Sequence, residues 1–150
     1  MRKKCFGLFF VLLFLFILVG CTKNIKYTHF KTSDNIDYFS KKPTVILSLE
    51  ELSTYVGDKN MNEVSKYTND FFEDNMLIVF IVPESSFGNK SSLVGYDIKN
   101  EIIEIYIETE HNGVGAEFAL SYFALELEEN QKSIKEIKIY KDGKSIYYNY

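Results

Sequence analysis

The feature that most constrains this chain is the apolar run at residues 76–82, which ends at Pro83. It is rich in β-branched and aromatic residues, has turn-forming residues on both sides, and is too short to cross a bilayer. A strand with one wet face alternates between apolar and polar residues, whereas a continuous run is typical of a strand covered on both faces. The run therefore predicts the central strand of a folded domain.

The N-terminus has the pattern of a targeting segment. Three basic residues at positions 2–4 precede an apolar stretch at residues 6–19 that only Gly7 interrupts. A stretch of this length is typical of a signal-peptide core rather than of a transmembrane helix. An uncleaved anchor, or an ordinary secretory signal with a chance cysteine, is the alternative.

The next residues, Leu18-Val19-Gly20-Cys21, resemble the lipobox of bacterial lipoproteins. The resemblance implies that residues 1–20 are removed and that Cys21 is diacylated and becomes the new N-terminus. Two acyl chains give stable anchoring, which one chain alone does not. The predicted organisation is a signal peptide at 1–20, a lipidated cysteine and short tether at 21–24, and a single globular domain at 25–150. Its predicted location is the extracytoplasmic face of the cell membrane.

Composition excludes several classes of function. Without the three basic leader residues, 14 basic residues face 21 acidic ones, a formal charge of −7, which argues against nucleic-acid partners and against electrostatic docking on anionic lipid. Cys5 lies in the leader and Cys21 is the acyl acceptor, so the mature domain has no free thiol. Disulfides, cysteine-ligated zinc and thiol redox chemistry are therefore not expected. The apolar fraction of 46% supplies a globular core.

The segment 48–74 predicts short helices. Ser48 and Glu51 form a capping box before an apolar stripe, and Gly57 is well placed to end that helix. A second capping pattern begins at Asn60, and the pair Phe71-Phe72 is expected to fill the core beside the central strand. These pieces are expected to cover one face of residues 76–82.

The other elements are predicted to be strands. They lie at 25–30, 44–47, 92–98, 101–108 and 121–128, with a final hairpin at Asp142-Gly143 that sets Ile139 opposite Ile146 and Ile137 opposite Tyr148. Residues 116–120 fit a helix or a strand. The predicted fold class is α+β: a single antiparallel sheet of about five to seven strands, with short helices packed on one face.

The hairpin at 92–108 is predicted to turn at Lys99-Asn100. That register places Glu104, Tyr106 and Glu108 on the solvated face. The face predicted to be buried contains Val94, Tyr96, Ile98, Ile103, Ile105 and Ile107.

Motifs that carry chemistry are scarce. His29 has no partner in the sequence, and His111 lies beside Glu108 and Glu110 without metal-site spacing. The serines lack a nucleophile-elbow context, and no phosphate loop, calcium loop or dinucleotide fingerprint is present. We therefore predict no catalytic, cofactor-binding or metal-ligating residues.

The predicted hairpin brings the loops 83–91 and 109–115 to one end of the sheet. Polar loops gathered on a rigid sheet are common binding surfaces. The candidate interaction residues there are Ser85, Ser86, Phe87, Asn89, His111 and Asn112. Phe87 is either an exposed anchor for a partner or a plug folded onto the core.

The order of elements from 77 to 128 resembles the C-terminal domain of protease-complex accessory lipoproteins, the PrcB-like family. The matching parts are the strand at 77–82, the loop at Gly88, the hairpin at 94–107, and Leu120-Ser121-Tyr122. The resemblance implies a non-catalytic accessory partner of a surface protein. The first hypothesis is thus a membrane-anchored, non-enzymatic binding module for a protein or a cell-envelope component. The alternative is an envelope-associated hydrolase or metal-dependent enzyme that uses the two loops.

Overall fold

A computed structural model of the protein describes residues 24–32, 41–112, 118–128, 130 and 133–146. Those residues form two four-stranded sheets. The first sheet has the order β1 (Tyr27–Thr32), β6 (Ala119–Glu128), β3 (Asn75–Glu84), β2 (Thr44–Ile46). The second has the order β4 (Lys90–Lys99), β5 (Ile102–Glu110), β7 (Glu136–Lys141), β8 (Lys144–Ser145). Three helical pieces, α2 (Leu49–Val56), η2 (Asp58–Val64) and α3 (Phe71–Asp74), complete the described fold.

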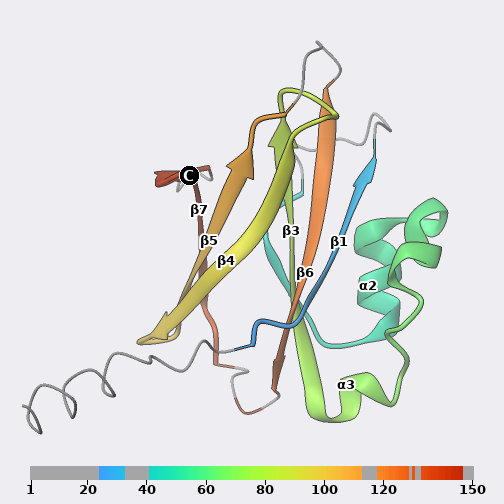
Figure 1. Ribbon diagram of the computed structural model, residues 1–150. Coiled ribbons are helices and arrows are strands. Elements are labelled where there is room, and N and C mark those ends of the chain that lie inside the picture. The colour runs from blue at the N-terminus through green and yellow to red at the C-terminus, as the bar shows by residue number, and fades with distance from the viewer. Residues whose placement is uncertain (1–23, 33–40, 113–117, 129, 131–132, 147–150) are drawn as a thin grey trace, which may run out of the picture.

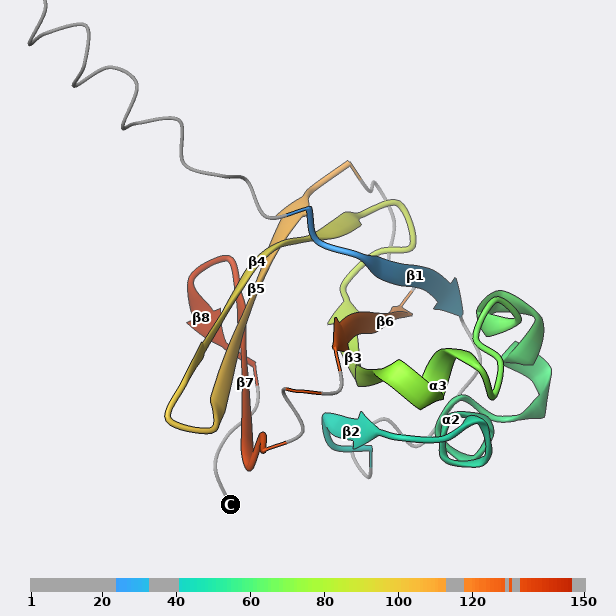
Figure 2. The same ribbon diagram turned by 90° about the horizontal axis from the view of Figure 1, so that it is seen from below.

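The central apolar run forms β3 and is covered on both faces, as predicted. Leu77, Val79 and Ile81 pack with the helices, whereas the residues between them pack against the second sheet. The molecule therefore has three layers: helices, first sheet and second sheet (Figures 1 and 2). Every residue from 76 to 82 is at most 1% exposed.

The prediction of a single antiparallel sheet is wrong. Helices cover one face of the first sheet, and the cover on its other face is a second sheet. The chain leaves the second sheet after β5, adds β6 to the first, and returns as β7, which pairs with β5 in parallel. No pattern within a few residues predicts that the chain returns to the second sheet. A strand that is buried on both faces can be covered by helices or by another sheet, and its own sequence does not distinguish the two.

The first helix begins and ends where the sequence predicts. The backbone amide of Glu51 donates to the Ser48 hydroxyl (3.2 Å), and the Glu51 carboxylate accepts from the amide of Leu47 (2.7 Å). Gly57 ends α2 with φ of +78°, a conformation that glycine adopts without steric cost. The second predicted cap, at Asn60, is wrong: the 3₁₀ helix η2 begins at Asp58, after Gly57 and without a side-chain cap, so Asn60 lies inside it. Phe72 packs in the core, as predicted.

The hairpin of β4 and β5 differs from its predicted register. A turn at Lys99-Asn100 would pair Ile98 with Glu101. The turn instead lies at Asn100-Glu101, both with positive φ, and Ile98 pairs with Ile103. Ile103, Ile105 and Ile107 keep their predicted buried face because the shift is by two residues.

The prediction that Val94 lies on the buried face is wrong. A bulge between Leu93 and Gly95 turns Leu93 inward and leaves Val94 46% exposed. Glu104, Tyr106 and Glu108 are on the outer face, as predicted: Glu104 is half-buried, and Tyr106 and Glu108 are exposed.

The second predicted hairpin is confirmed. Asp142 and Gly143 both have positive φ, and the amide of Ile146 donates to the carbonyl of Ile139 (3.1 Å). Of the segment left open between helix and strand, Ala119 and Leu120 belong to β6. Residues 116 and 117, the leader with Cys21, and Tyr148 lie outside the described residues. No helix of the described residues is both long and apolar enough to cross a membrane.

Candidate functional site

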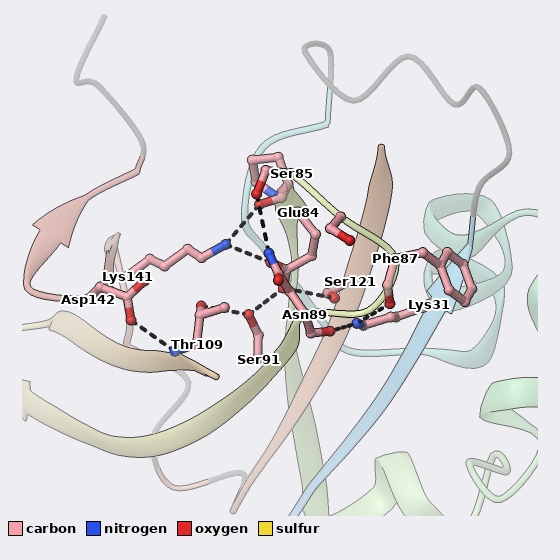
Figure 3. Close-up of polar contacts among 12 residues, drawn as sticks. Lys31, Glu84, Ser85, Phe87, Asn89, Ser91, Thr109, Ser121, Lys141 and Asp142 are labelled. Carbon is pink, nitrogen blue, oxygen red and sulfur yellow. Dashed lines mark hydrogen bonds and ion pairs between the residues drawn. The ribbon is translucent and has the colours of Figure 1, made fainter. Parts of the chain in front are cut away.

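The space between the two sheets becomes polar at one end. Along several strands, the residues that face the space between the sheets are apolar for most of the strand. They become polar at the end of the molecule where the loop between β3 and β4 lies. The transitions are Val82 to Glu84, Phe123 to Ser121, Leu93 to Ser91, Ile107 to Thr109 and Ile139 to Lys141. We call Glu84, Ser91, Thr109, Ser121 and Lys141 the inter-sheet polar cluster (Figure 3).

Glu84 is the centre of this cluster and is completely buried. Its Oε1 accepts hydrogen bonds from the hydroxyls of Ser91 and Ser121, the latter at 3.2 Å. Its Oε2 pairs with Lys141 Nζ at 2.8 Å, and the same ammonium donates to the carbonyl of Pro83 at 2.9 Å. A buried carboxylate with an opposite charge and two hydroxyl donors is fully satisfied.

The cluster ties the two sheets together. Glu84 and Ser121 belong to the first sheet, whereas Ser91 and Lys141 belong to the second. The network extends outward, because the Ser91 hydroxyl is 2.9 Å from that of Thr109, whose amide donates to Asp142 Oδ1 (2.9 Å). The arrangement closes this end of the inter-sheet core with charge-assisted hydrogen bonds.

His29 lies on the edge strand β1 beside this cluster. Its ring stacks on Phe123 with centroids 4.5 Å apart, and its buried Nε2 has no hydrogen-bond partner among the described residues. Burial, and secondarily the positive charge of Lys31, lowers the pKa of His29, while Glu84 opposes the shift. The fold therefore favours the neutral form of the His29 imidazole over the protonated form.

This predicts a pH dependence of stability. Because the folded pKa of His29 lies below its ordinary value of 6.5, the unfolded chain takes up a proton first as the pH falls. Stability from this group is complete above pH 6.5 and is lost below it, by at most about 1.4 kcal/mol per pH unit. Urea unfolding of His29→Phe, which keeps the stacked ring, should show a flatter profile between pH 7 and 5 than wild type. Equal profiles for His29→Phe and wild type would contradict the assignment.

The loop between β3 and β4 is shorter than the predicted 83–91, since Pro83 and Glu84 belong to β3 and Lys90 and Ser91 to β4. Two of its candidate interaction residues are buried, Ser86 at 6% and Asn89 at 3% exposed, and they hold the loop rather than face a partner. The Ser86 hydroxyl accepts from the amide of Gly88, and the Asn89 side-chain amide donates to Ser85, each at 3.2 Å.

Phe87 projects from this loop and is 46% exposed, so it is not a core plug. The Lys31 ammonium lies 5.9 Å from the centre of its ring and donates to the carbonyls of Phe87 (3.1 Å) and Asn89. These contacts fix the loop while leaving the aromatic ring on the surface (Figure 3).

The two predicted loops do share one end of the molecule. Ser91 pairs with Thr109, so the exposed residues His111 and Asn112 follow β5 at the end where the Phe87 loop precedes β4. Phe118 joins them, because Ala119 pairs with Glu84 at the start of β6. It is 58% exposed and was missed, since its place depends on the β3–β6 register.

The inter-sheet polar cluster was also missed from the sequence. The sequence signal is a polar residue two positions from a buried apolar one, as Lys141 is from Ile139, because both then lie on the same face of the strand. This signal predicts a cluster only when the two sheets are known to face each other. Across the described ranges, no group of three or more histidine, cysteine, aspartate or glutamate side chains is arranged to hold a metal ion.

Comparisons of the chain with protein-family models, curated proteins and solved structures found no match.

Proposed function

We propose that this protein is a lipid-anchored extracytoplasmic lipoprotein whose domain is a non-enzymatic binding or accessory module for a protein or cell-envelope component. The observation that carries the proposal is the pair of exposed aromatic side chains, Phe87 and Phe118, at the loop end. Large aromatic rings on a surface offer contact area at low entropic cost and are frequent anchors of interfaces.

The chemistry of the neighbouring polar groups favours binding over catalysis. A general acid or base must come within hydrogen-bond reach of a substrate. Glu84 is fully buried, and both of its oxygens are bonded to side chains of the protein. Its role is to hold the sheets in place and thereby to support the loops at this end.

Strand β1 begins at the end of the first sheet that is opposite the loops. Asn24 follows Cys21 by three positions in the sequence, a reach of at most about 11 Å. From its start at Tyr27, strand β1 runs about 13 Å to Lys31, which contacts Phe87 (Figure 1). With acyl chains on Cys21, the start of β1 lies near the membrane and the loop end can face outward, toward an extracytoplasmic partner. An accessory role agrees with the resemblance to protease-complex accessory lipoproteins.

The test is cross-linking and affinity capture from intact cells that express the full-length chain. Wild type is expected in the membrane fraction, labelled by a fatty-acid probe, with a captured partner. Phe87→Ala with Phe118→Ala should reduce capture at least tenfold and leave fatty-acid labelling unchanged. The double variant should melt within a few degrees of wild type, because both rings are largely exposed.

A second variant separates the anchor from the binding surface. Cys21→Ser should abolish labelling and leave a larger, unprocessed precursor. Labelling that persists in Cys21→Ser would refute the lipoprotein assignment, and capture unaffected by loss of both phenylalanines would refute the loop end as the binding surface.

A further inference from the structure

An aromatic row crosses the outer face of the second sheet, the face that points away from the first sheet. Strand register places Gly95, Tyr106, Tyr140 and Ser145 side by side on β4, β5, β7 and β8. The rings of Tyr106 and Tyr140 are nearly parallel, at 21°, with centroids 5.6 Å apart. Small residues therefore stand at both ends of a tyrosine pair.

The bulge in β4 shapes this row. It turns Val94 outward, 46% exposed, and places Gly95 opposite Tyr106. A Cβ at Gly95 would lie 3.6 Å from Cδ2 of Tyr106, so this ring extends beside the glycine. We call Val94, Gly95, Tyr106 and Tyr140 the tyrosine platform.

Glu104 fixes the platform from the adjacent row. Its two carboxylate oxygens accept hydrogen bonds from the hydroxyls of Tyr106 (3.0 Å) and Tyr140 (3.4 Å). This hydrogen bond raises the pKa of Tyr106, so its hydroxyl remains a donor to Glu104. Rings that are already ordered lose little side-chain entropy when a ligand packs against them.

Polar groups border the platform on both sides. The row that contains Glu104 also contains Asp97 and Lys138. On this side a hollow of about 140 Å³ is lined by Asp97, Lys99, Asn100, Ile102 and Glu104. On the other side, Ser92 and Glu108 are paired and exposed.

We propose that the tyrosine platform binds a neutral pyranose unit of a cell-envelope glycan. A pyranose presents a face of C–H groups that packs on aromatic rings, and its hydroxyls extend from the ring edge. Beside the platform lie the carboxylates of Asp97, Glu104 and Glu108 and the ammonium groups of Lys99 and Lys138, which supply acceptors and donors to the hydroxyls of a neutral sugar. The excess of carboxylates disfavours an anionic sugar at this face. The proposal rests on the proposed function, because it gives the chemistry of one envelope component.

The test is isothermal titration calorimetry of the full-length lipidated protein in a detergent without a sugar headgroup. The probes are hexasaccharides of N-acetylglucosamine and of glucose. At least one should bind wild type, and Tyr106→Ala and Tyr140→Ala should each weaken its affinity at least tenfold. Tyr140→Phe, which keeps the ring, should stay within about threefold of wild type, since one good hydrogen bond is worth less than the lost ring contact.

Gly95→Thr gives a second route that leaves both rings in place. The added Cβ makes only ordinary contact with Tyr106, and the outer face of β4 is open to solvent at the neighbouring Val94, so we expect the fold to tolerate threonine. The larger side chain should obstruct the platform and lower the affinity at least tenfold. Phe87→Ala, at the loop end, is the matched control and should bind like wild type.

The proposal is overturned if neither hexasaccharide binds wild type, or if binding survives both the tyrosine and the Gly95 variants. Platform-dependent binding of a lysine-rich peptide in place of both sugars would overturn it in favour of a cationic protein partner. Capture through Phe87 and labelling of Cys21 are measured separately, so failure here is distinguishable from failure of the proposed function.

Discussion

Replacing Lys141 by methionine is expected to lower the free energy of unfolding by about 3–5 kcal/mol, because the fully buried Glu84 loses the ion pair that Lys141 supplies. Methionine keeps most of the aliphatic stem, so the change removes charge rather than volume. The carbonyl of Pro83 loses a hydrogen bond in the same substitution. Urea unfolding at neutral pH measures the effect.

Two further variants make this result specific. Adding Glu84→Gln to Lys141→Met should recover at least half of the loss, since a neutral amide oxygen still accepts from Ser91 and Ser121. Lys138→Met, on the same strand, breaks only a partly exposed ion pair with Glu136 and should cost less than about 1 kcal/mol. If Lys141→Met costs no more than Lys138→Met, the inter-sheet polar cluster does not stabilise the fold.

Replacing Ile105 by aspartate should unfold the domain or cost more than about 4 kcal/mol. Ile105 is completely buried between the sheets, in register with Tyr96 and Ile139. The substitution removes a core side chain and buries an unpaired carboxylate, two costs that add. Thermal melting followed by circular dichroism measures the loss.

Glu108→Ala is the matched control for Ile105→Asp, on the same strand but on its exposed face. It should change stability by less than about 0.5 kcal/mol. Comparable losses in the two variants would mean that the assigned faces of β5 are wrong.

The two proposed binding surfaces are separate. The loop end contains Phe87 and Phe118 beside the inter-sheet polar cluster, whereas the tyrosine platform lies on the outer face of the second sheet. Under the two proposals, the module would bind its protein partner and a glycan at different surfaces.

The sequence by itself determined the features that depend on neighbouring residues. The β3 run predicted a strand with two covered faces, Ser48 and Gly57 marked the ends of α2, and Asp142-Gly143 marked a hairpin. Alternation assigned Ile103, Ile105 and Ile107 to a buried face even though the predicted turn was misplaced, because a shift of two residues preserves parity. Each signal works within a few residues along the chain.

The tertiary structure alone decided what covers each buried face. Apolar residues on both faces of a strand indicate that both faces are covered, but they do not indicate by what. Here the cover on one face is a second sheet with a parallel β5–β7 pair, where helices would have served equally well. The inter-sheet polar cluster joins residues up to 57 positions apart, and the tyrosine platform depends on a bulge and on strand order. Contacts between distant residues come from strand pairing and layer packing, so the inter-sheet polar cluster and the tyrosine platform could not be predicted from the sequence, whereas the loop end with Phe87 could.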